Sequence, residues 1–309
     1  MTQEEYKQMM QCVQTGSILE TFGIDAGFRM IRDAGFQGVD FNIDHTLPYD
    51  VIAGGGSVPI YDAGEEALID AMRPYKEAAD RHAIRIVQMH APFPSLVKNE
   101  AGNAYVRKAI IACIRAAAYF SCKYLIVHPF FLGYADKLSP EAEWNANIEG
   151  YSALIPAAKK YGVTICLENM FSSHNGKIYA ACCADMAEAN RYIDRLNEIA
   201  GEKVFAFCLD TGHALLVGKD ISQTIRELGP RLETLHIHDN NGMQDQHLFP
   251  YMGVLDWDRF ISGLKEIGYQ GDLSFETFNA LNVIDDALAA EALTFLGAIG
   301  RLFAKRIEG

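Results

Sequence analysis

Short apolar segments alternate with longer stretches of helical spacing along almost all of this 309-residue chain. The apolar segments are rich in Val, Ile, Leu and Phe, which is typical of parallel strands buried on both faces. Strands are expected at residues 9–14, 38–43, 84–90, 124–128, 163–168, 204–210, 232–238 and 272–276. Helices are expected at residues 24–34, 64–82, 101–121, 141–161, 184–200, 220–229, 256–268 and 285–305. Eight strand–helix units are the number that closes a (β/α)8 TIM barrel, so the sequence predicts this α/β fold.

An open, doubly wound sheet is the structural alternative, because it also alternates strands with helices. Open-sheet chains of this length usually divide into two domains, yet no Pro- or Ser-rich linker interrupts this sequence. No G-x-G-x-x-G motif follows the first expected strand, which argues against a dinucleotide-binding half. Residues 1–309 are therefore expected to form a single TIM-barrel domain.

Charge and cysteine content narrow the class of protein. With 27 Lys and Arg against 40 Asp and Glu, the formal net charge is −13, and such a surface repels nucleic-acid backbones and anionic lipids. The seven cysteines form no C-x-x-C pair, and several lie in apolar segments, as free thiols in a reducing compartment do. No secretory signal begins the chain, and no apolar run approaches the length of a membrane span. A soluble, cytoplasmic protein without a membrane or nucleic-acid partner is expected.

Side chains that can bind metals stand at the ends of six consecutive expected strands, from the third to the eighth. They are His90, His128, Glu168, Asp210 with His213 one turn later, His236 with His238, and Glu276. In a barrel the carboxyl ends of all strands meet at one rim, so these side chains would face a shared cavity. A single buried histidine is ordinarily satisfied by a backbone carbonyl, but that explanation would have to hold independently at every position. Two buried glutamates also call for a neutralising cation, and the mixed carboxylates and imidazoles suit Mn²⁺, Mg²⁺, Co²⁺ or Zn²⁺.

Four long connections follow expected strands, at residues 44–63, 91–100, 169–183 and 239–255. In a barrel they would gather over the same rim, either as lids over a site or as plain surface insertions. The connection 44–63 contains Gly54-Gly55-Gly56 and is expected to be mobile. Five aromatic residues lie just beyond strand ends and could either wall a sugar pocket or cover the barrel mouth: Phe93, Phe130, Phe131, Phe171 and Phe249.

Four motifs at strand ends carry a family resemblance. They are "CLEN" (166–169), "CLDTGH" (208–213), "LHIHDNNG…DQH" (235–247) and "SFET" (274–277). Each motif alone is weakly specific, but the ordered set resembles the xylose isomerase-like TIM barrels over nearly the whole barrel. That superfamily contains sugar and sugar-phosphate isomerases and epimerases, together with endonuclease IV.

The resemblance implies roles for individual residues. In its epimerase branch a Glu, an Asp, a His and a second Glu bind one divalent ion, and these match Glu168, Asp210, His236 and Glu276. Glu168 and Glu276 are the implied catalytic pair, which exchanges a carbon-bound proton on opposite faces of the sugar through a metal-stabilised enediolate. The implied function is a metal-dependent isomerase or epimerase of a sugar, sugar phosphate or polyol-derived substrate. His213 would then bind a substrate hydroxyl or a second metal.

Endonuclease IV supplies the alternative function, a zinc phosphodiesterase acting on abasic DNA. Its three-zinc site has nine ligands, and this chain matches their order with His90, His128, Glu168, Asp210, His213, His236, Asp245, His247 and Glu276. Five of these, namely His90, His128, His213, Asp245 and His247, are therefore expected either to bind further metals or to contact substrate. The negative charge and the scarcity of Lys and Arg in the connections 91–100 and 239–255 argue against a site that grips several phosphates.

The sequence also departs from one branch of the superfamily. Ketohexose 3-epimerases typically carry an arginine shortly after the seventh-strand histidine, where this chain has Asp239-Asn240-Asn241-Gly242. The resemblance therefore implies a small sugar or sugar derivative without extending to a free ketohexose. His238 is expected to line the rim. A binding protein without turnover is a third interpretation, against which the two ligand glutamates argue. Barrels of this type often form homo-oligomers, and no residue pattern here fixes that state.

Overall fold

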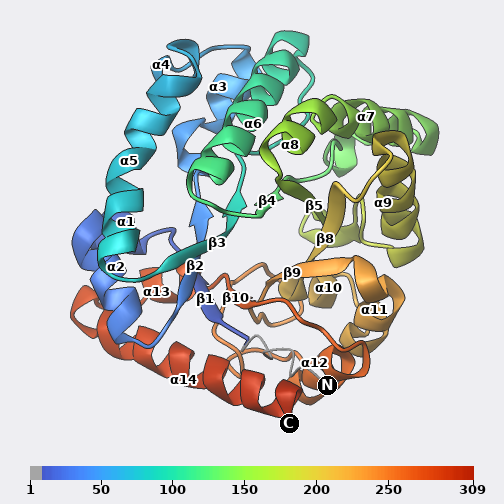
Figure 1. The fold of residues 1–309 in the computed structure, drawn as a ribbon. Coiled ribbons are helices and arrows are strands. Elements are labelled where there is room, and N and C mark those ends of the chain that lie inside the picture. Colours follow the sequence, from blue (N-terminus) through green and yellow to red (C-terminus); the bar gives the residue numbers. More distant parts are fainter. Residues whose placement is uncertain (1–8) are drawn as a thin grey trace, which may run out of the picture.

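Eight parallel strands form the centre of the fold in a computed structural model that describes residues 9–309 (Figure 1). The strands are β1 (Gln11–Gln14), β2 (Gly38–Asn42), β3 (Arg85–His90), β4 (Tyr124–Ile126), β5 (Thr164–Glu168), β8 (Phe205–Asp210), β9 (Leu232–His236) and β10 (Leu273–Phe275). They pair in the order β10-β1-β2-β3-β4-β5-β8-β9. The amide of Ile237 donates to the carbonyl of Ser274 at 2.8 Å, and the amide of Glu276 donates to the carbonyl of Ile237 at 3.1 Å, which joins β9 to β10. The predicted (β/α)8 barrel is confirmed.

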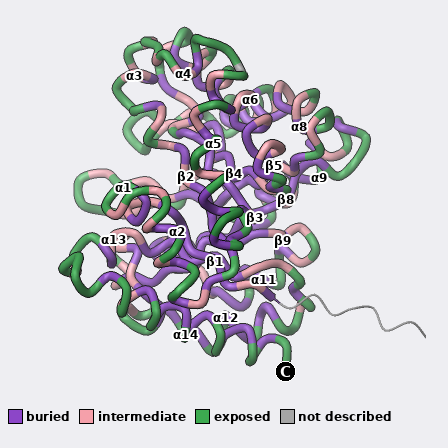
Figure 2. The backbone as a smooth tube through the Cα atoms, turned by 60° about the vertical axis from the view of Figure 1, so that its left-hand side comes forward, coloured by how far each residue is buried: buried purple, intermediate pink, exposed green. Residues whose placement is uncertain are grey.

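Long helices form the outer layer of the barrel. They are α2 (Ile24–Asp33), α5 (Glu65–Arg81), α6 (Glu100–Tyr119), α7 (Pro140–Ser152), α8 (Ile155–Tyr161), α9 (Met186–Ala200), α11 (Ile221–Leu228), α12 (Trp257–Glu266) and α14 (Ala289–Glu308). Figure 2 shows the buried chain running through the centre and the exposed positions on the outward sides of these helices. Apolar side chains of the helices fill the space between the two layers, as the alternating pattern requires.

The sequence pattern missed several short elements. Within residues 9–309 there are also five short α-helices: α1 (Ile18–Phe22), α3 (Tyr49–Gly54), α4 (Pro59–Asp62), α10 (Thr211–Leu216) and α13 (Phe278–Asn282). The expected mobile connection 44–63 therefore contains two helices, which are too short to show helical periodicity in the sequence. The expected single helix 141–161 is wrong as well, because Pro156 lies in the first turn of α8 and lacks the amide that a continuous helix would use.

The connection 169–183 is a β-hairpin, not an irregular loop. Its strands are β6 (Phe171–His174) and β7 (Lys177–Ala180), and they pair antiparallel. The two turn residues, Asn175 and Gly176, have positive φ angles of 50° and 73°. Asn-Gly is the most favourable dipeptide for a two-residue hairpin turn, so the signal is present in the sequence.

The C-terminal helix α14 corrects the expectation about apolar runs. A segment from Asp286 to Glu308 is long and apolar enough, by length and composition alone, to cross a membrane. Leu293, Leu296 and Phe303 are nevertheless fully buried against the barrel, as in the core helix of a globular fold. The expectation that no secretory signal begins the chain concerns residues 1–8, which lie outside the described residues.

Candidate metal centre

Four buried side chains converge at the carboxyl ends of neighbouring strands β5, β8, β9 and β10: Glu168, Asp210, His236 and Glu276. The Nδ1 atom of His236 lies 3.3 Å from Oε1 of Glu168 and 3.4 Å from Oε2 of Glu276. Oε2 of Glu168 and Nδ1 of His236 are buried and have no hydrogen-bond partner among the described residues. Unsatisfied buried acceptors of both kinds are what a divalent cation requires of its ligands, so these residues fit a metal.

Asp40 determines which nitrogen of His236 is free. The imidazole Nε2–H of His236 donates to Oδ2 of Asp40 at 2.9 Å, and the amide of Gln88 donates to the same oxygen at 2.9 Å. A carboxylate only accepts in this pair, so a neutral His236 carries its proton on Nε2, and the lone pair of Nδ1 then faces the two glutamates. This is the usual way in which a neighbouring carboxylate orients a metal-binding histidine. The sequence did not show this contact.

Asp210 is held by three residues, each from a different one of the sequence motifs. The side chain of Asn169, in the CLEN motif, donates to the backbone carbonyl of Asp210 and accepts from its amide, both at 2.8 Å. The Asp210 carboxylate accepts from the backbone amide of His213 at 2.6 Å and from Nε2 of His238 at 2.9 Å. The DTGH motif therefore caps the short helix α10 with the same carboxylate that faces the metal centre.

The glycine of the DTGH motif makes room for His238. A Cβ atom on Gly212 would lie 2.0 Å from Cε1 of His238, so no larger residue fits while the ring keeps its position. Thr211 holds the backbone of His238 in place, because the Thr211 hydroxyl donates to the carbonyl of His238 at 2.7 Å. His238 is fully buried and supports Asp210, so the expectation that it lines the rim is wrong.

The two glutamates have different electrostatic surroundings. Burial alone would raise the pKa of Glu168, but the imidazoles of His236 and His128 hold it well below its ordinary value. Burial raises the pKa of Glu276 above its ordinary value. Gln14, at the end of β1, donates to Oε1 of Glu276 at 2.6 Å and fixes this carboxyl group. No motif in the sequence pointed to this role of Gln14.

A second cluster joins Glu168 to the ends of β3 and β4. The Nε2 atoms of His90 and His128 lie 3.1 Å apart, and Nε2 of His128 lies 3.3 Å from Oε2 of Glu168. Nδ1–H of His90 donates to the carbonyl of Ala91 at 2.8 Å, so Nε2 of a neutral His90 carries a lone pair. Two imidazoles and a carboxylate thus present ligand atoms to one point.

A third cluster consists of His213, Asp245 and His247. Nδ1–H of His213 donates to the carbonyl of Asn169, and Nδ1–H of His247 donates to that of Glu276, both at 2.9 Å. Their Nε2 atoms lie 3.7 Å and 3.0 Å from Oδ2 of Asp245. Burial alone would lower the pKa values of both histidines, but Asp210, Asp245 and Glu276 raise them to about 10 for His213 and about 9 for His247.

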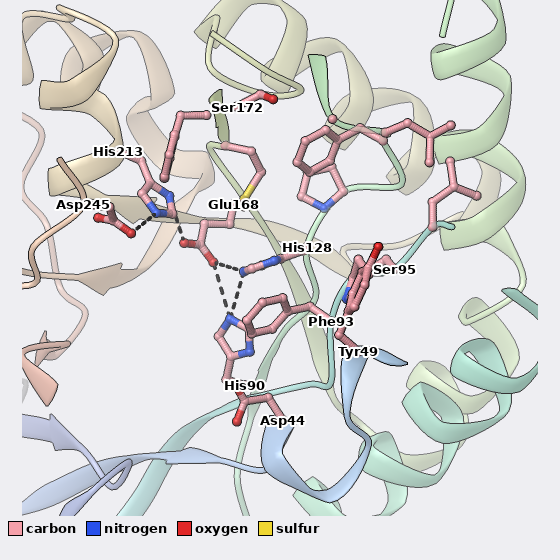
Figure 3. Close-up of a pocket in the computed structure, with 18 of the residues that line it drawn as sticks. Asp44, Tyr49, His90, Phe93, Ser95, His128, Glu168, Ser172, His213 and Asp245 are labelled. Atoms are coloured by element: carbon pink, nitrogen blue, oxygen red, sulfur yellow. Dashed lines mark hydrogen bonds and ion pairs between the residues drawn. The ribbon is translucent and has the colours of Figure 1, made fainter. Parts of the chain in front are cut away.

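All nine side chains that the sequence suggested as ligands therefore lie around one end of the barrel. Among the described residues they fall into four overlapping groups that could hold a metal, and His238 belongs to two of these groups. The cavity above them has a volume of about 650 Å³ (Figure 3). Residues from the connections 44–63, 91–100 and 169–183 line it, so these segments surround the site. Phe93, Phe131 and Phe171 line the cavity, as expected for the wall of a pocket. Phe130 and Phe249 are instead buried in the core.

Sequence relatives include a protein of Methanocaldococcus jannaschii that is 29% identical over 215 residues, or 67% of this chain and 69% of the relative. A protein of Metamycoplasma arthritidis designated "probable endonuclease 4" is 27% identical over 136 residues, which is 44% of each chain.

Three solved structures have a similar fold. A D-tagatose 3-epimerase-like protein has a TM-score of 0.68 at 22% identity, over 95% of this chain and 99% of the other. The 3-keto-D-glucoside 4-epimerase of E. coli has a TM-score of 0.71 at 18% identity, over 96% of this chain and 100% of the other. The zinc-bound IolI protein has a TM-score of 0.69 at 18% identity, over 96% of this chain and 98% of the other. At these identities the likeness concerns the fold.

The chain also matches one protein family over most of its length. The model of one family, described as the xylose isomerase-like TIM barrel, matches residues 28–299, which is most of the chain and includes all four strand-end motifs. The resemblance seen in those motifs is thereby confirmed. This chain belongs to the xylose isomerase-like TIM barrel family.

Proposed function

We propose that this protein is a metal-dependent sugar isomerase or epimerase. The observation that carries the proposal is the pair of buried glutamates, Glu168 and Glu276, which face the same nitrogen, Nδ1, of His236 at 3.3 and 3.4 Å beside the cavity. Both carboxylates also line the cavity, so a substrate carbon can lie between them. The three similar folds named above are those of a D-tagatose 3-epimerase-like protein, a 3-keto-D-glucoside 4-epimerase and a zinc-bound protein, which supports this class.

Glu168, Asp210, His236 and Glu276 would hold one divalent ion, which when bound acts as a Lewis acid on carbonyl and hydroxyl oxygens of the sugar. The protein supplies the proton transfer. One glutamate removes the proton from the carbon next to the carbonyl, and the other returns a proton to the same or the neighbouring carbon. Asp40 and Gln14 keep His236 and Glu276 in position for this exchange.

The lining of the cavity favours an uncharged sugar over a sugar phosphate. Lys98 is the only Lys or Arg among the described residues that line the cavity, and it forms an ion pair with Asp136. A phosphate group would therefore meet a cation that is already neutralised, and it would lie near several carboxylates. A neutral sugar needs only hydroxyl-binding groups and apolar walls, both of which are present.

Solvent deuterium exchange tests the proposal. Neutral aldoses, ketoses and ketoglycosides are incubated with the Mn²⁺-loaded protein in D₂O and followed by proton NMR. We expect one C–H signal next to the carbonyl to disappear with at least one substrate, and we expect Glu276→Gln to slow this exchange at least about 100-fold. Exchange at an undiminished rate in Glu276→Gln would contradict the assignment of this base, and no exchange with any sugar in the wild-type protein would contradict the function.

A zinc phosphodiesterase acting on abasic DNA is the second candidate function. It is supported by the two outer clusters, His90–His128–Glu168 and His213–Asp245–His247, which supply the ligands of two further metals, and by the Metamycoplasma arthritidis relative. This candidate requires about three zinc ions per chain and cleavage of an abasic duplex. Metal analysis of the purified protein, combined with that cleavage assay, distinguishes it from the isomerase.

A further inference from the structure

The cavity is larger than a single sugar ring requires. At ~30 Å³ per water in the liquid, 650 Å³ has room for roughly twenty water-sized groups, whereas a hexose brings only about twelve non-hydrogen atoms. A sugar held at the metal centre would therefore leave close to half of the cavity to another part of the ligand.

The two ends of the cavity differ in chemistry. The end nearest β8, β9 and β10 carries His213, Asp245 and Glu276. The connections after β2, β3 and β4 line the opposite end with the charged side chains of Asp44, Lys98 and Asp136 and with a group of apolar and aromatic side chains. This group, which we call the apolar chamber, consists of Tyr49, Phe93, Leu96, Val97, Phe131 and Leu132. Figure 3 shows Phe93 and Tyr49 on the far side of His90 and His128 from Asp245. A ligand that fills the cavity therefore meets metal-binding side chains at one end and the apolar chamber at the other.

Phe93 joins the two ends. Its ring centroid lies 4.7 Å from that of His128 and 5.7 Å from that of His90, so the apolar chamber begins directly beside the metal-binding clusters. Phe93 is 42% exposed and Tyr49 is 65% exposed, although both are large aromatic side chains. Aromatic surface left uncovered around a cavity is typical of a ligand-binding wall.

A buried hydroxyl in the same wall lacks a partner. Ser95 is 2% exposed, lines the cavity, and its Oγ has no hydrogen-bond partner among the described residues. A buried hydroxyl without a partner is unfavourable, so a ligand atom that accepts or donates there would satisfy it. The Ser95 hydroxyl thus lies beside the apolar and aromatic side chains of the apolar chamber.

We propose that the substrate is a glycoside with an aromatic aglycone: the sugar ring lies at the metal centre, and the aglycone lies in the apolar chamber with a polar substituent at Ser95. The proposal builds on the proposed function for the sugar end.

Proton transfer requires that such a glycoside contain a carbonyl group. In a glycoside the anomeric carbon is an acetal, so the carbonyl that makes a neighbouring C–H acidic must lie at another ring carbon. A reaction that oxidises a ring hydroxyl to a ketone must therefore supply the substrate, and the proton exchange itself involves no net oxidation.

Equilibrium binding tests the aglycone site without turnover. The probes are methyl and phenyl glycosides of glucose, galactose, mannose and xylose, in both anomeric forms, titrated calorimetrically into the Mn²⁺-loaded protein. They carry no ketone, so the proposed proton transfer cannot occur. We expect at least one phenyl glycoside to bind at least about tenfold more tightly than its methyl partner, because the ring removes apolar surface from water.

Variants assign this preference to the apolar chamber. Phe93→Ala is expected to reduce the phenyl-to-methyl ratio of affinities to about one-third or less, and the ratio cancels any effect of the variant on the sugar end. Leu132→Ala is a second, independent variant of the same wall. Phe295→Ala is the matched control, since Phe295 is 50% exposed on α14 and does not line the cavity, and it should leave the ratio unchanged.

A substituted ring tests Ser95. A 4-hydroxyphenyl glycoside should lose about fivefold in affinity, relative to the plain phenyl glycoside, when Ser95 is replaced by Ala. If no phenyl glycoside binds more tightly than its methyl partner, or if the preference survives both Phe93→Ala and Leu132→Ala, the aglycone site is contradicted. Failure of the aglycone site does not contradict the proposed isomerase function, which is tested separately by proton exchange into a free sugar.

Discussion

At the scale of single residues, the metal centre depends on which nitrogen of each histidine carries the proton. Backbone carbonyls fix this choice for His90, His213 and His247, and the carboxylate of Asp40 fixes it for His236. A carbonyl or carboxylate only accepts a hydrogen bond, so in the neutral imidazole that binds a metal the opposite nitrogen has its lone pair toward the site. The sequence shows which residues are histidines, but the tautomers follow from contacts between distant segments.

Asp40→Asn tests this orientation. The amide can still accept from Nε2–H of His236, but without the negative charge that strengthens the hydrogen bond and the basicity of Nδ1. We expect the affinity for Mn²⁺ or Zn²⁺, measured by competition with a chelating indicator, to fall by about 10- to 100-fold. Asp44→Asn is the matched control on the same side of the cavity. An unchanged metal affinity in Asp40→Asn would show that Asp40 does not orient a ligand.

The histidines of the third cluster predict how pH affects the metal-free protein. The pKa values of His213 and His247, about 10 and about 9, lie above the value of about 6.5 for an unfolded histidine. The ion pairs of these histidines with Asp245 therefore stabilise the fold fully below pH ~6.5, and this contribution is lost as the pH rises through 9 to 10. The melting temperature of the EDTA-treated protein should fall over this range, and it should fall less in Asp245→Asn. Identical pH profiles of the two proteins would contradict the raised pKa values.

At the scale of elements, the barrel strands and long helices could be predicted from the sequence because each contributes an apolar face of regular period. The structure confirms all eight expected barrel strands, with ends that differ by at most two residues. Short elements such as α3, α4 and α10 could not be predicted in this way, since they span about one or two turns and show no period. The hairpin β6–β7 was missed although Asn175-Gly176 marks its turn, because the segment was interpreted only as a connection between barrel strands.

In the candidate site, too, some features could be predicted from the sequence and others could not. The positions at strand ends were predictable because parallel strands bring their carboxyl ends to one rim. The supporting contacts of Gln14, Asn169 and Asp40 could not be predicted, because each joins segments that are far apart in the chain. Asp40 and His236, for example, are separated by 196 residues, and only the closed barrel brings them together.

The packing of α10 against the segment after β9 gives a prediction at this scale. Replacing Gly212 by Ala places a methyl group where the ring of His238 lies, so the ring must move and Asp210 loses one of its donors. We expect Gly212→Ala to weaken metal binding at least about tenfold, as loss of a supporting contact does. Gly54→Ala is the matched control, since a Cβ at Gly54 meets nothing within 4 Å. Equal metal affinities of these two variants would show that His238 does not support the site.

At the scale of the whole molecule, the charge distribution separates the two candidate functions. The chain carries a net charge of −13, and Lys98, already paired with Asp136, is the only Lys or Arg among the described residues lining the cavity. Proteins that neutralise several phosphates lose affinity steeply with salt. We therefore expect no salt-dependent binding of an abasic DNA duplex in a fluorescence anisotropy titration. Binding that weakens steeply between low and moderate salt would favour the phosphodiesterase.

The central claim is that Glu168, Asp210, His236 and Glu276 hold a divalent ion beside the cavity. The most direct measurement is a crystal structure of the Mn²⁺-loaded protein with data collected above and below the manganese absorption edge. The strongest anomalous peak should lie at coordination distance from Nδ1 of His236, about 2.0–2.3 Å, with carboxylate oxygens of Glu168, Asp210 and Glu276 around it. An anomalous map with no peak at this position, or with peaks only at the His213–Asp245–His247 cluster, would contradict the claim.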